Sequence, residues 1–87
     1  MTQPESERVK AAIAAILAAK AATQIPELHD DLDLRSAGLV DSLGFVQLID
    51  ALERRLGYPV NLAELNPNEL TRVGPLSRHI AWRRALP

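Results

Sequence analysis

The chain has 87 residues, a formal net charge of −1 and no cysteine. A chain of this length buries one small core, so we expect a single domain over residues 1–87 with no room for a deep catalytic cavity. Without cysteine there are no disulfides, and the polypeptide supplies no thiol chemistry. The N-terminus lacks the pattern of a secretory signal and no apolar run is long enough to span a membrane, so a cytoplasmic protein is expected.

A first helix is predicted to run from the N-terminal segment to about residues 22–23. Residues 2–5, Thr-Gln-Pro-Glu, have the spacing of a capping box with a proline in the first turn. Pro26 disfavours helical geometry at the residue before it, which sets the end. The apolar residues of this segment follow helical spacing and form one buried face: Val9, Ile13, Ile16 and Leu17.

A long loop is predicted from there to Val40, followed by a second helix from Ser42 to Leu56. Asp41 has the side chain of an N-cap residue, and Gly57 suits the left-handed position that ends a helix. Loops of this length inside a compact domain carry function or are held by their own apolar anchors. The anchors expected here are Leu28, Leu32, Leu34 and Leu39.

The last third of the chain is predicted to hold one short helix, or two turns, over residues 61–69. A final helix is predicted from about residues 74–75 to near Leu86. The fold class is therefore all-α, a small four-helix bundle of three longer helices and one short one, with a long loop between the first two. The predicted core is Val9, Ile13, Ile16, Leu17, Leu34, Phe45, Leu48, Ile49, Leu52, Leu56, Val60, Leu65, Leu70, Val73, Leu76 and Ile80.

Charge is distributed unevenly along the chain. Between positions 27 and 53 Arg35 is the only basic residue, whereas from Arg72 onward there are four arginines and no acid. The acidic residues of the first segment are Glu27, Asp30, Asp31, Asp33, Asp41, Asp50 and Glu53. We expect this segment to steer basic partner surfaces toward the start of the second helix, with a merely solvated acidic loop as the alternative.

Ser42 falls at the first helical position after the capping aspartate, where a side chain points to solvent. A serine hydrolase would need His29 or His79 beside it with an orienting acid and an oxyanion site, and no motif supports that arrangement. A dedicated calcium loop starting at Asp31 is excluded, because Arg35 falls at a ligand position and serine replaces the required glycine. No metal site is predicted, and loose divalent-ion contacts of the acidic loop are left open.

The run from Gly38 to Gly44, Gly-Leu-Val-Asp-Ser-Leu-Gly, together with the order of elements around it, resembles the carrier-protein family. In that family the serine of an Asp-Ser-Leu motif is the attachment point of a 4′-phosphopantetheine arm. The resemblance implies that a phosphopantetheinyl transferase moves the arm from coenzyme A to the Ser42 hydroxyl. It also implies that Asp41 and Leu43 border the arm, that the cargo is held as a thioester, and that the chain alone is not an enzyme.

The residues after the serine bear on which kind of carrier this is. Fatty-acid-synthesis carriers commonly have acidic residues two and five positions after the serine, where this chain has Gly44 and Gln47. The pattern is more similar to stand-alone D-alanyl and other aminoacyl or peptidyl carriers. An aminoacyl cargo is therefore slightly favoured over a fatty acyl one, with an adenylating ligase and a downstream acyl- or aminoacyl-transferring enzyme as partners. We assign partner binding to Gly44, Val46, Gln47 and Asp50.

A small helical protein-interaction module, in which Ser42 carries nothing, is the alternative from another class. It explains the amphipathic helices equally well, but not why a long loop delivers an Asp-Ser pair to a helix start. Nucleic-acid binding is not expected, because acidic residues near that helix would repel phosphates. We expect a monomer.

Overall fold

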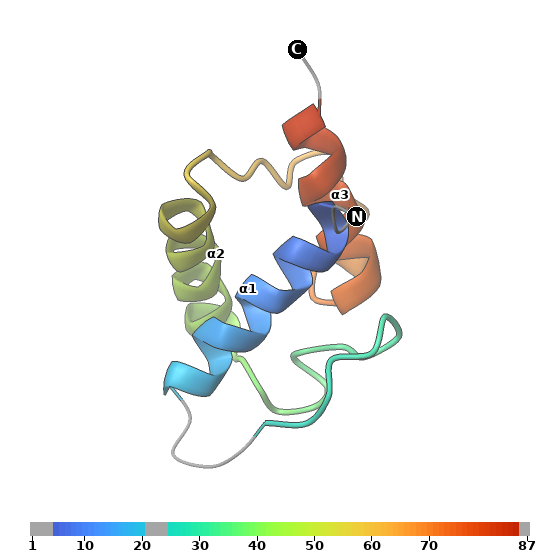
Figure 1. The fold of residues 1–87 in the computed structure, drawn as a ribbon. Coiled ribbons are helices and arrows are strands. Elements are labelled where there is room, and N and C mark those ends of the chain that lie inside the picture. Colours follow the sequence, from blue (N-terminus) through green and yellow to red (C-terminus); the bar gives the residue numbers. More distant parts are fainter. Residues whose placement is uncertain (1–4, 21–24, 86–87) are drawn as a thin grey trace.

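The computed structural model describes residues 5–20 and 25–85, without the side chains of residues 83–85. This part of the chain forms three α-helices, α1 (Glu5–Lys20), α2 (Ser42–Leu56) and α3 (Val73–Ala85), and one 3-10 turn, η1 (Pro67–Glu69) (Figure 1). The all-α prediction is confirmed. The predicted capping box at residues 2–5 and the predicted helix ends at residues 22–23 and at Leu86 extend outside the described residues.

Where a fourth, short helix was predicted, the described chain has only the turn η1. Asn61 and Asn66 each use a side-chain oxygen to accept a backbone N–H two residues on, at 2.9 Å in both cases. Pro67 favours an extended residue before it, and Asn66 has ψ 128°. A helix therefore cannot run through both asparagines, and the segment forms separate turns.

Helix α1 packs against both α2 and α3 (Figure 1). Its apolar face meets the facing stripes of the other two helices, and Ile13, Leu52 and Leu76 are completely buried. The buried apolar core consists of Val9, Ala12, Ile13, Ile16, Leu17, Leu28, Leu34, Leu48, Leu52, Leu56, Val73, Leu76 and Ile80.

Most of the predicted core is confirmed, and five predicted members are only half-buried: Phe45, Ile49, Val60, Leu65 and Leu70. Phe45 and Ile49 flank the stripe of α2 that meets α1, so they contact the core from its edge. The sequence analysis missed Ala12 and Ser77. Ser77 is 1 % exposed, and its Oγ has no hydrogen-bond partner in the described chain.

The predicted loop anchors are confirmed: Leu28 and Leu34 are buried, and Leu32 and Leu39 pack against the core. Backbone hydrogen bonds also fix the loop to the start of α3. Leu34 N donates to the Thr71 carbonyl at 2.7 Å, Val73 N to Leu32 at 2.9 Å, and Gly74 N to Asp30 at 2.9 Å. Because Val73 is already held in this way, α3 begins there, slightly before the predicted start.

The C-terminal end of α2 follows the sequence prediction. Gly57 has φ 84° and its N–H donates to the Glu53 carbonyl, which is the left-handed termination that glycine favours. No helix in the described residues has the length and apolar character needed to cross a membrane.

Candidate functional site

Ser42 is the first residue of α2 and its side chain is exposed. The helix starts there because Asp41 has an extended backbone (φ −102°, ψ −171°) and caps the first turn. Asp41 Oδ1 accepts the Gly44 N–H at 2.6 Å, and the Asp41 carbonyl accepts the Phe45 N–H at 2.8 Å. The predicted N-cap role of Asp41 and the exposed position of Ser42 are confirmed.

The N-terminal amides of α2 make this position suitable for a negatively charged group. The first amides of a helix have no intrahelical partner. Among the first three amides of α2, the Asp41 side chain accepts a hydrogen bond from that of Gly44 only. Within the described part of the chain, the amides of Ser42 and Leu43 therefore remain available to an anion, aided by the positive end of the helix dipole. A phosphate ester on Ser42 Oγ fits this environment.

Local packing explains why position 44 is a glycine. A Cβ at this position would lie 2.9 Å from Asp41 Oδ1 and would push that oxygen away from the amide that it accepts. Packing at the helix start is therefore a sufficient reason for glycine at this position.

The loop delivers Ser42 on a fixed backbone. Asp33 Oδ1 accepts the Thr71 hydroxyl at 2.8 Å as well as the amides of Arg35 and Ser36 at 3.0 and 3.3 Å. These hydrogen bonds lower the pKa of Asp33, and the one from the Thr71 hydroxyl has the largest effect. Further along, the amides of Leu39 and Val40 both donate to the Leu34 carbonyl, at 2.9 and 3.3 Å. The segment before Ser42 is thus tied to the core and to α3.

Two large apolar side chains next to Ser42 are exposed to solvent. Leu43 is 66 % exposed and Val46 63 % exposed, and their spacing of three places them on one face of α2. Neither belongs to the predicted core, and the structure places both on the surface. A pair of exposed apolar residues beside a presented serine is a suitable contact for an arm or for a partner.

Gln47 and Asp50 extend this exposed side of α2, and each has a cationic neighbour. Lys20 Nζ, at the end of α1, donates to Gln47 Oε1 at 3.2 Å, a contact that the sequence analysis did not predict. Asp50 forms an ion pair with Arg54, four residues on, at 3.0 Å. Helical periodicity could find the second contact, whereas the first depends on how α1 and α2 cross.

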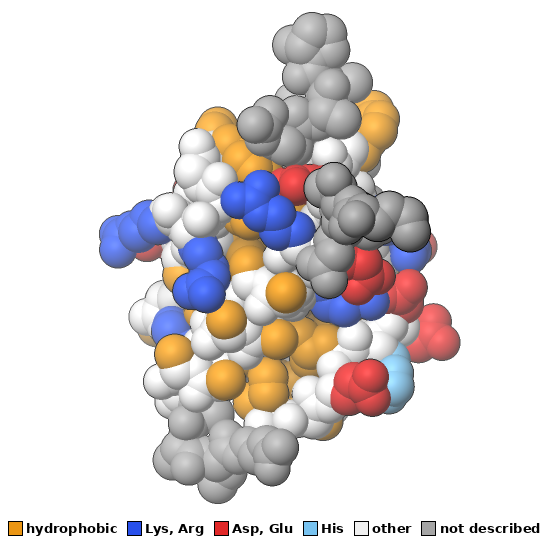
Figure 2. All heavy atoms as spheres, in the orientation of Figure 1, with side chains coloured by type: hydrophobic (Ala, Val, Ile, Leu, Met, Phe, Trp, Pro, Cys, Tyr) orange, Lys and Arg blue, Asp and Glu red, His pale blue; other side chains and the backbone are white. Residues whose placement is uncertain are grey.

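The acidic segment is less negative in three dimensions than in the sequence. Asp30 lies 2.6 Å from Lys10 Nζ and 3.4 Å from Arg78 Nη1, so cations from both α1 and α3 neutralise it. The hydrogen bond between Lys10 and Asp30 lowers the pKa of Asp30 and raises that of Lys10. On the face shown in Figure 2, basic side chains lie mainly on the side of α2 and acidic ones mainly on the opposite side. Asp30 therefore adds little negative charge to the approach to Ser42.

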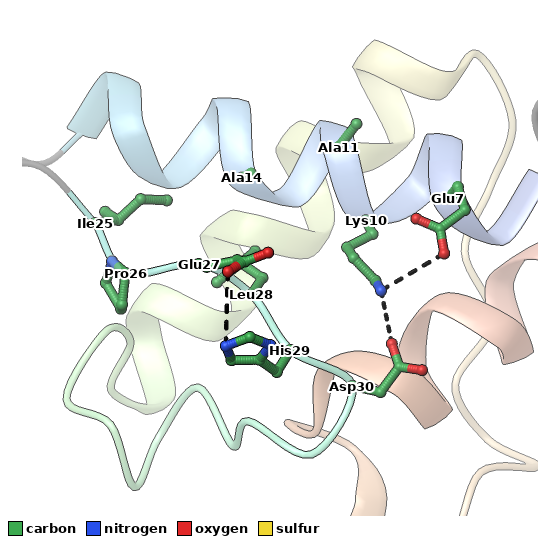
Figure 3. Close-up of a pocket in the computed structure, with 10 residues that line it drawn as sticks. All are labelled: Glu7, Lys10, Ala11, Ala14, Ile25, Pro26, Glu27, Leu28, His29 and Asp30. Carbon is green, nitrogen blue, oxygen red and sulfur yellow. Dashed lines mark ion pairs between the residues drawn. The ribbon is translucent and has the colours of Figure 1, made fainter.

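A hollow of 790 Å³ lies between α1 and the start of the loop (Figure 3). Its polar side chains already contact one another: Lys10 pairs with Glu7 and Asp30, and His29 Nε2 lies 3.7 Å from Glu27 Oε2. None of the residues that line it comes from α2. This hollow is thus separate from the Ser42 site.

The described residues around Ser42 do not form a hydrolase active site or a metal centre. His79 Nε2 lies 2.8 Å from the Asn61 carbonyl oxygen and its ring is tilted against that of Trp82, while His29 lies beside Glu27. Within residues 5–20 and 25–85, no three His, Asp or Glu side chains come together as a group that could hold a metal ion. Ser42 is therefore presented as an isolated hydroxyl at a capped helix start.

A known protein family matches most of the chain. The chain matches the family described as "Phosphopantetheine attachment site" over residues 7–80. The matched region runs from the first turn of α1 to the middle of α3 and contains the whole loop and α2. No curated protein and no solved structure matches the chain at the significance required.

Proposed function

We propose that this chain, which belongs to the phosphopantetheine-attachment family, carries its arm on Ser42 and serves as a carrier for aminoacyl groups. The observation that supports Ser42 is its place as an exposed hydroxyl at the capped start of α2. Of the other described serines, Ser77 is buried within α3, and Ser6 and Ser36 do not begin a helix.

Family membership establishes the coarser part of the function. The protein is a carrier with a covalent 4′-phosphopantetheine group, and it is not itself an enzyme. A phosphopantetheinyl transferase and acyl-handling enzymes are its partners. The group supplies a thiol, which this cysteine-free chain lacks, and an acyl group can be held there as a thioester.

Each residue near Ser42 has a role in this proposal. Asp41 holds the first turn of α2 in place by its bond to Gly44 N, and the amides of Ser42 and Leu43 stabilise the negative phosphodiester. Leu43 also borders the arm. Val46, Gln47 and Asp50 meet the partner enzyme, because they continue the exposed side of α2 away from the serine.

An aminoacyl cargo, loaded by an adenylating ligase, is the finer part of the proposal. Its support is that Gly44 and Gln47 stand where fatty-acid-synthesis carriers commonly have acidic residues. Loading assays with purified adenylating ligases, each offered amino acids and fatty acids, test this part. Preferential transfer of fatty acids to the arm would contradict it. A cytoplasmic location, a monomeric state and a single domain over the whole chain stay predictions.

The attachment proposal is tested by intact mass before and after incubation with coenzyme A and a broad-specificity phosphopantetheinyl transferase. We expect one phosphopantetheinyl mass gain in the wild type and none in Ser42→Ala. Ser36→Ala is the matched control, because it removes another exposed hydroxyl of the same region and should still gain the mass.

No gain in a folded wild-type sample, with two transferases of different specificity active on control carriers, would contradict the attachment. That outcome would favour the interaction module, in which α2 is a docking surface without a prosthetic group. The family match favours the carrier over that alternative.

A further inference from the structure

We propose that Lys20 forms part of the docking face of this carrier. Its charge favours partners that carry an acidic side chain opposite it and disfavours partners with a basic docking surface. This inference rests on the proposed function, because it concerns the enzymes that act on Ser42. It names the chemistry of the partner, which the attachment site alone does not specify.

Lys20 reaches the exposed side of α2 although it belongs to another helix. It is the last residue of α1, and its ammonium donates to Gln47 Oε1 at 3.2 Å. Gln47 follows Val46 directly and lies one turn after Leu43, so the ammonium is beside the exposed apolar pair. Figure 1 shows the end of α1 next to the N-terminal half of α2.

The acidic groups in and beside α2 already make contacts within the chain. Asp50 is paired with Arg54 at 3.0 Å, whereas Glu53 accepts the Val60 amide at 2.7 Å and Asp41 the Gly44 amide at 2.6 Å, and these two keep their charge. Gln47 is neutral, and Lys20 adds a positive charge beside it. The exposed face that begins at Ser42 is therefore apolar in its centre and has the Lys20 cation at its α1 edge.

The expected partner follows from charge and apolar complementarity. Leu43 and Val46 gain by entering an apolar socket, since both are more than 60 % exposed in the free chain. A cation at the rim of the interface favours a partner carboxylate within a few ångströms and disfavours a partner lysine or arginine. The docking enzyme thus combines an apolar socket with an acidic group at the Lys20 edge.

The test uses two phosphopantetheinyl transferases chosen for carrier-docking surfaces of opposite charge, one basic and one acidic. The value of kcat/KM for arm attachment is measured at low and physiological ionic strength. We expect Lys20→Glu to raise kcat/KM about fivefold with the basic transferase and to lower it about fivefold with the acidic one, most strongly at low salt. Lys20→Met, which removes the charge without reversing it, should give a smaller change in the same directions.

Arg8→Glu is the matched control. It makes the same change in net charge at another exposed position of α1, but it lies 12 residues earlier, about 18 Å along the helix axis. This variant should leave both rates within about twofold of wild type. Circular dichroism of each variant checks that the fold is intact.

The outcomes separate this inference from the proposed function. If both transferases modify the wild type and Lys20→Glu changes both rates equally or neither, the inference is overturned and the attachment stands. Equal effects of Arg8→Glu and Lys20→Glu would also overturn it, because overall charge would then explain the rates. If neither transferase modifies the wild type, the proposed attachment fails and the inference falls with it.

Discussion

At the scale of single residues, the site depends on a short hydrogen bond rather than on catalytic groups. Asp41 accepts the Gly44 amide at 2.6 Å and thereby fixes where α2 begins. Ser42 is the first residue after this cap, so the direction of its Cα–Cβ bond follows from the cap geometry. The N-cap could be recognised from the sequence because aspartate before a periodic apolar series is a specific signal.

Replacing Asp41 by alanine should destabilise the protein by about 1 kcal/mol, because the Gly44 amide loses its acceptor. Asp41→Asn keeps a side-chain oxygen at the same distance from the backbone. It should therefore destabilise the protein by only a few tenths of that amount. The free energy of unfolding in urea measures both variants. Equal losses for the two substitutions would show that the negative charge, and not the capping bond, stabilises the helix start.

At the scale of elements, the helices were predictable and the path of the loop was not. Helix boundaries follow from local signals such as Asp41 and Gly57, which act within a few residues of the positions they specify. The pairing of the loop with the start of α3 joins residues about 40 positions apart, for example Leu34 N and the Thr71 carbonyl at 2.7 Å. Periodicity carries no information on such pairs, so only the apolar anchors of the loop could be predicted.

Gly74 permits this pairing because the loop passes very close to α3. A Cβ there would lie 2.8 Å from Asp30 Cβ and 3.0 Å from the Asp30 carbonyl oxygen. Gly74→Ala should therefore destabilise the protein by about 1–3 kcal/mol through overpacking, despite the better helix propensity of alanine. Urea unfolding followed by circular dichroism measures the change.

Ser77→Ala is the contrasting variant for Gly74→Ala, since it lies one turn further along α3 and removes atoms instead of adding them. Its buried hydroxyl has no partner among the described residues, so its loss should leave stability unchanged or higher. If Gly74→Ala were as stable as wild type, the close approach of the loop would not be a constraint in solution.

At the scale of the whole molecule, charge arrangement was the feature least accessible from the sequence. The segment from Glu27 to Glu53 is strongly acidic when only the sequence is considered. In the fold, Asp30 meets Lys10 and Arg78, and the Lys20 ammonium lies beside Gln47. These contacts join residues of the loop and of three different helices, and their geometry depends on the helix crossings. Local sequence patterns do not encode such crossings.

Acid should destabilise the protein in part through Asp33. The hydrogen bond from Thr71, followed by those from the Ser36 and Arg35 amides, lowers the pKa of Asp33 below its ordinary value of 3.8. A carboxyl with a lowered pKa in the folded state stabilises the protein at pH values above 3.8. That contribution is lost as the pH falls through the lowered pKa.

We therefore expect the free energy of unfolding to decrease less steeply below pH 3.8 in Asp33→Asn than in the wild type. Thr71→Val should flatten the same part of the profile, because the Thr71 hydroxyl is the main cause of the lowered pKa. Urea titrations across the acid range give the profile. An unchanged acid slope in both variants would show that other carboxyls control acid stability.

The central claim, that the arm is on Ser42, is tested most directly by fragmenting the modified protein in a tandem mass spectrometer. We expect the phosphopantetheinyl group on the peptide that contains Ser42, and we expect the fragment ions to assign it to that residue. The group on another hydroxyl, such as Ser36 or Thr71, would contradict the account, because neither residue begins a capped helix.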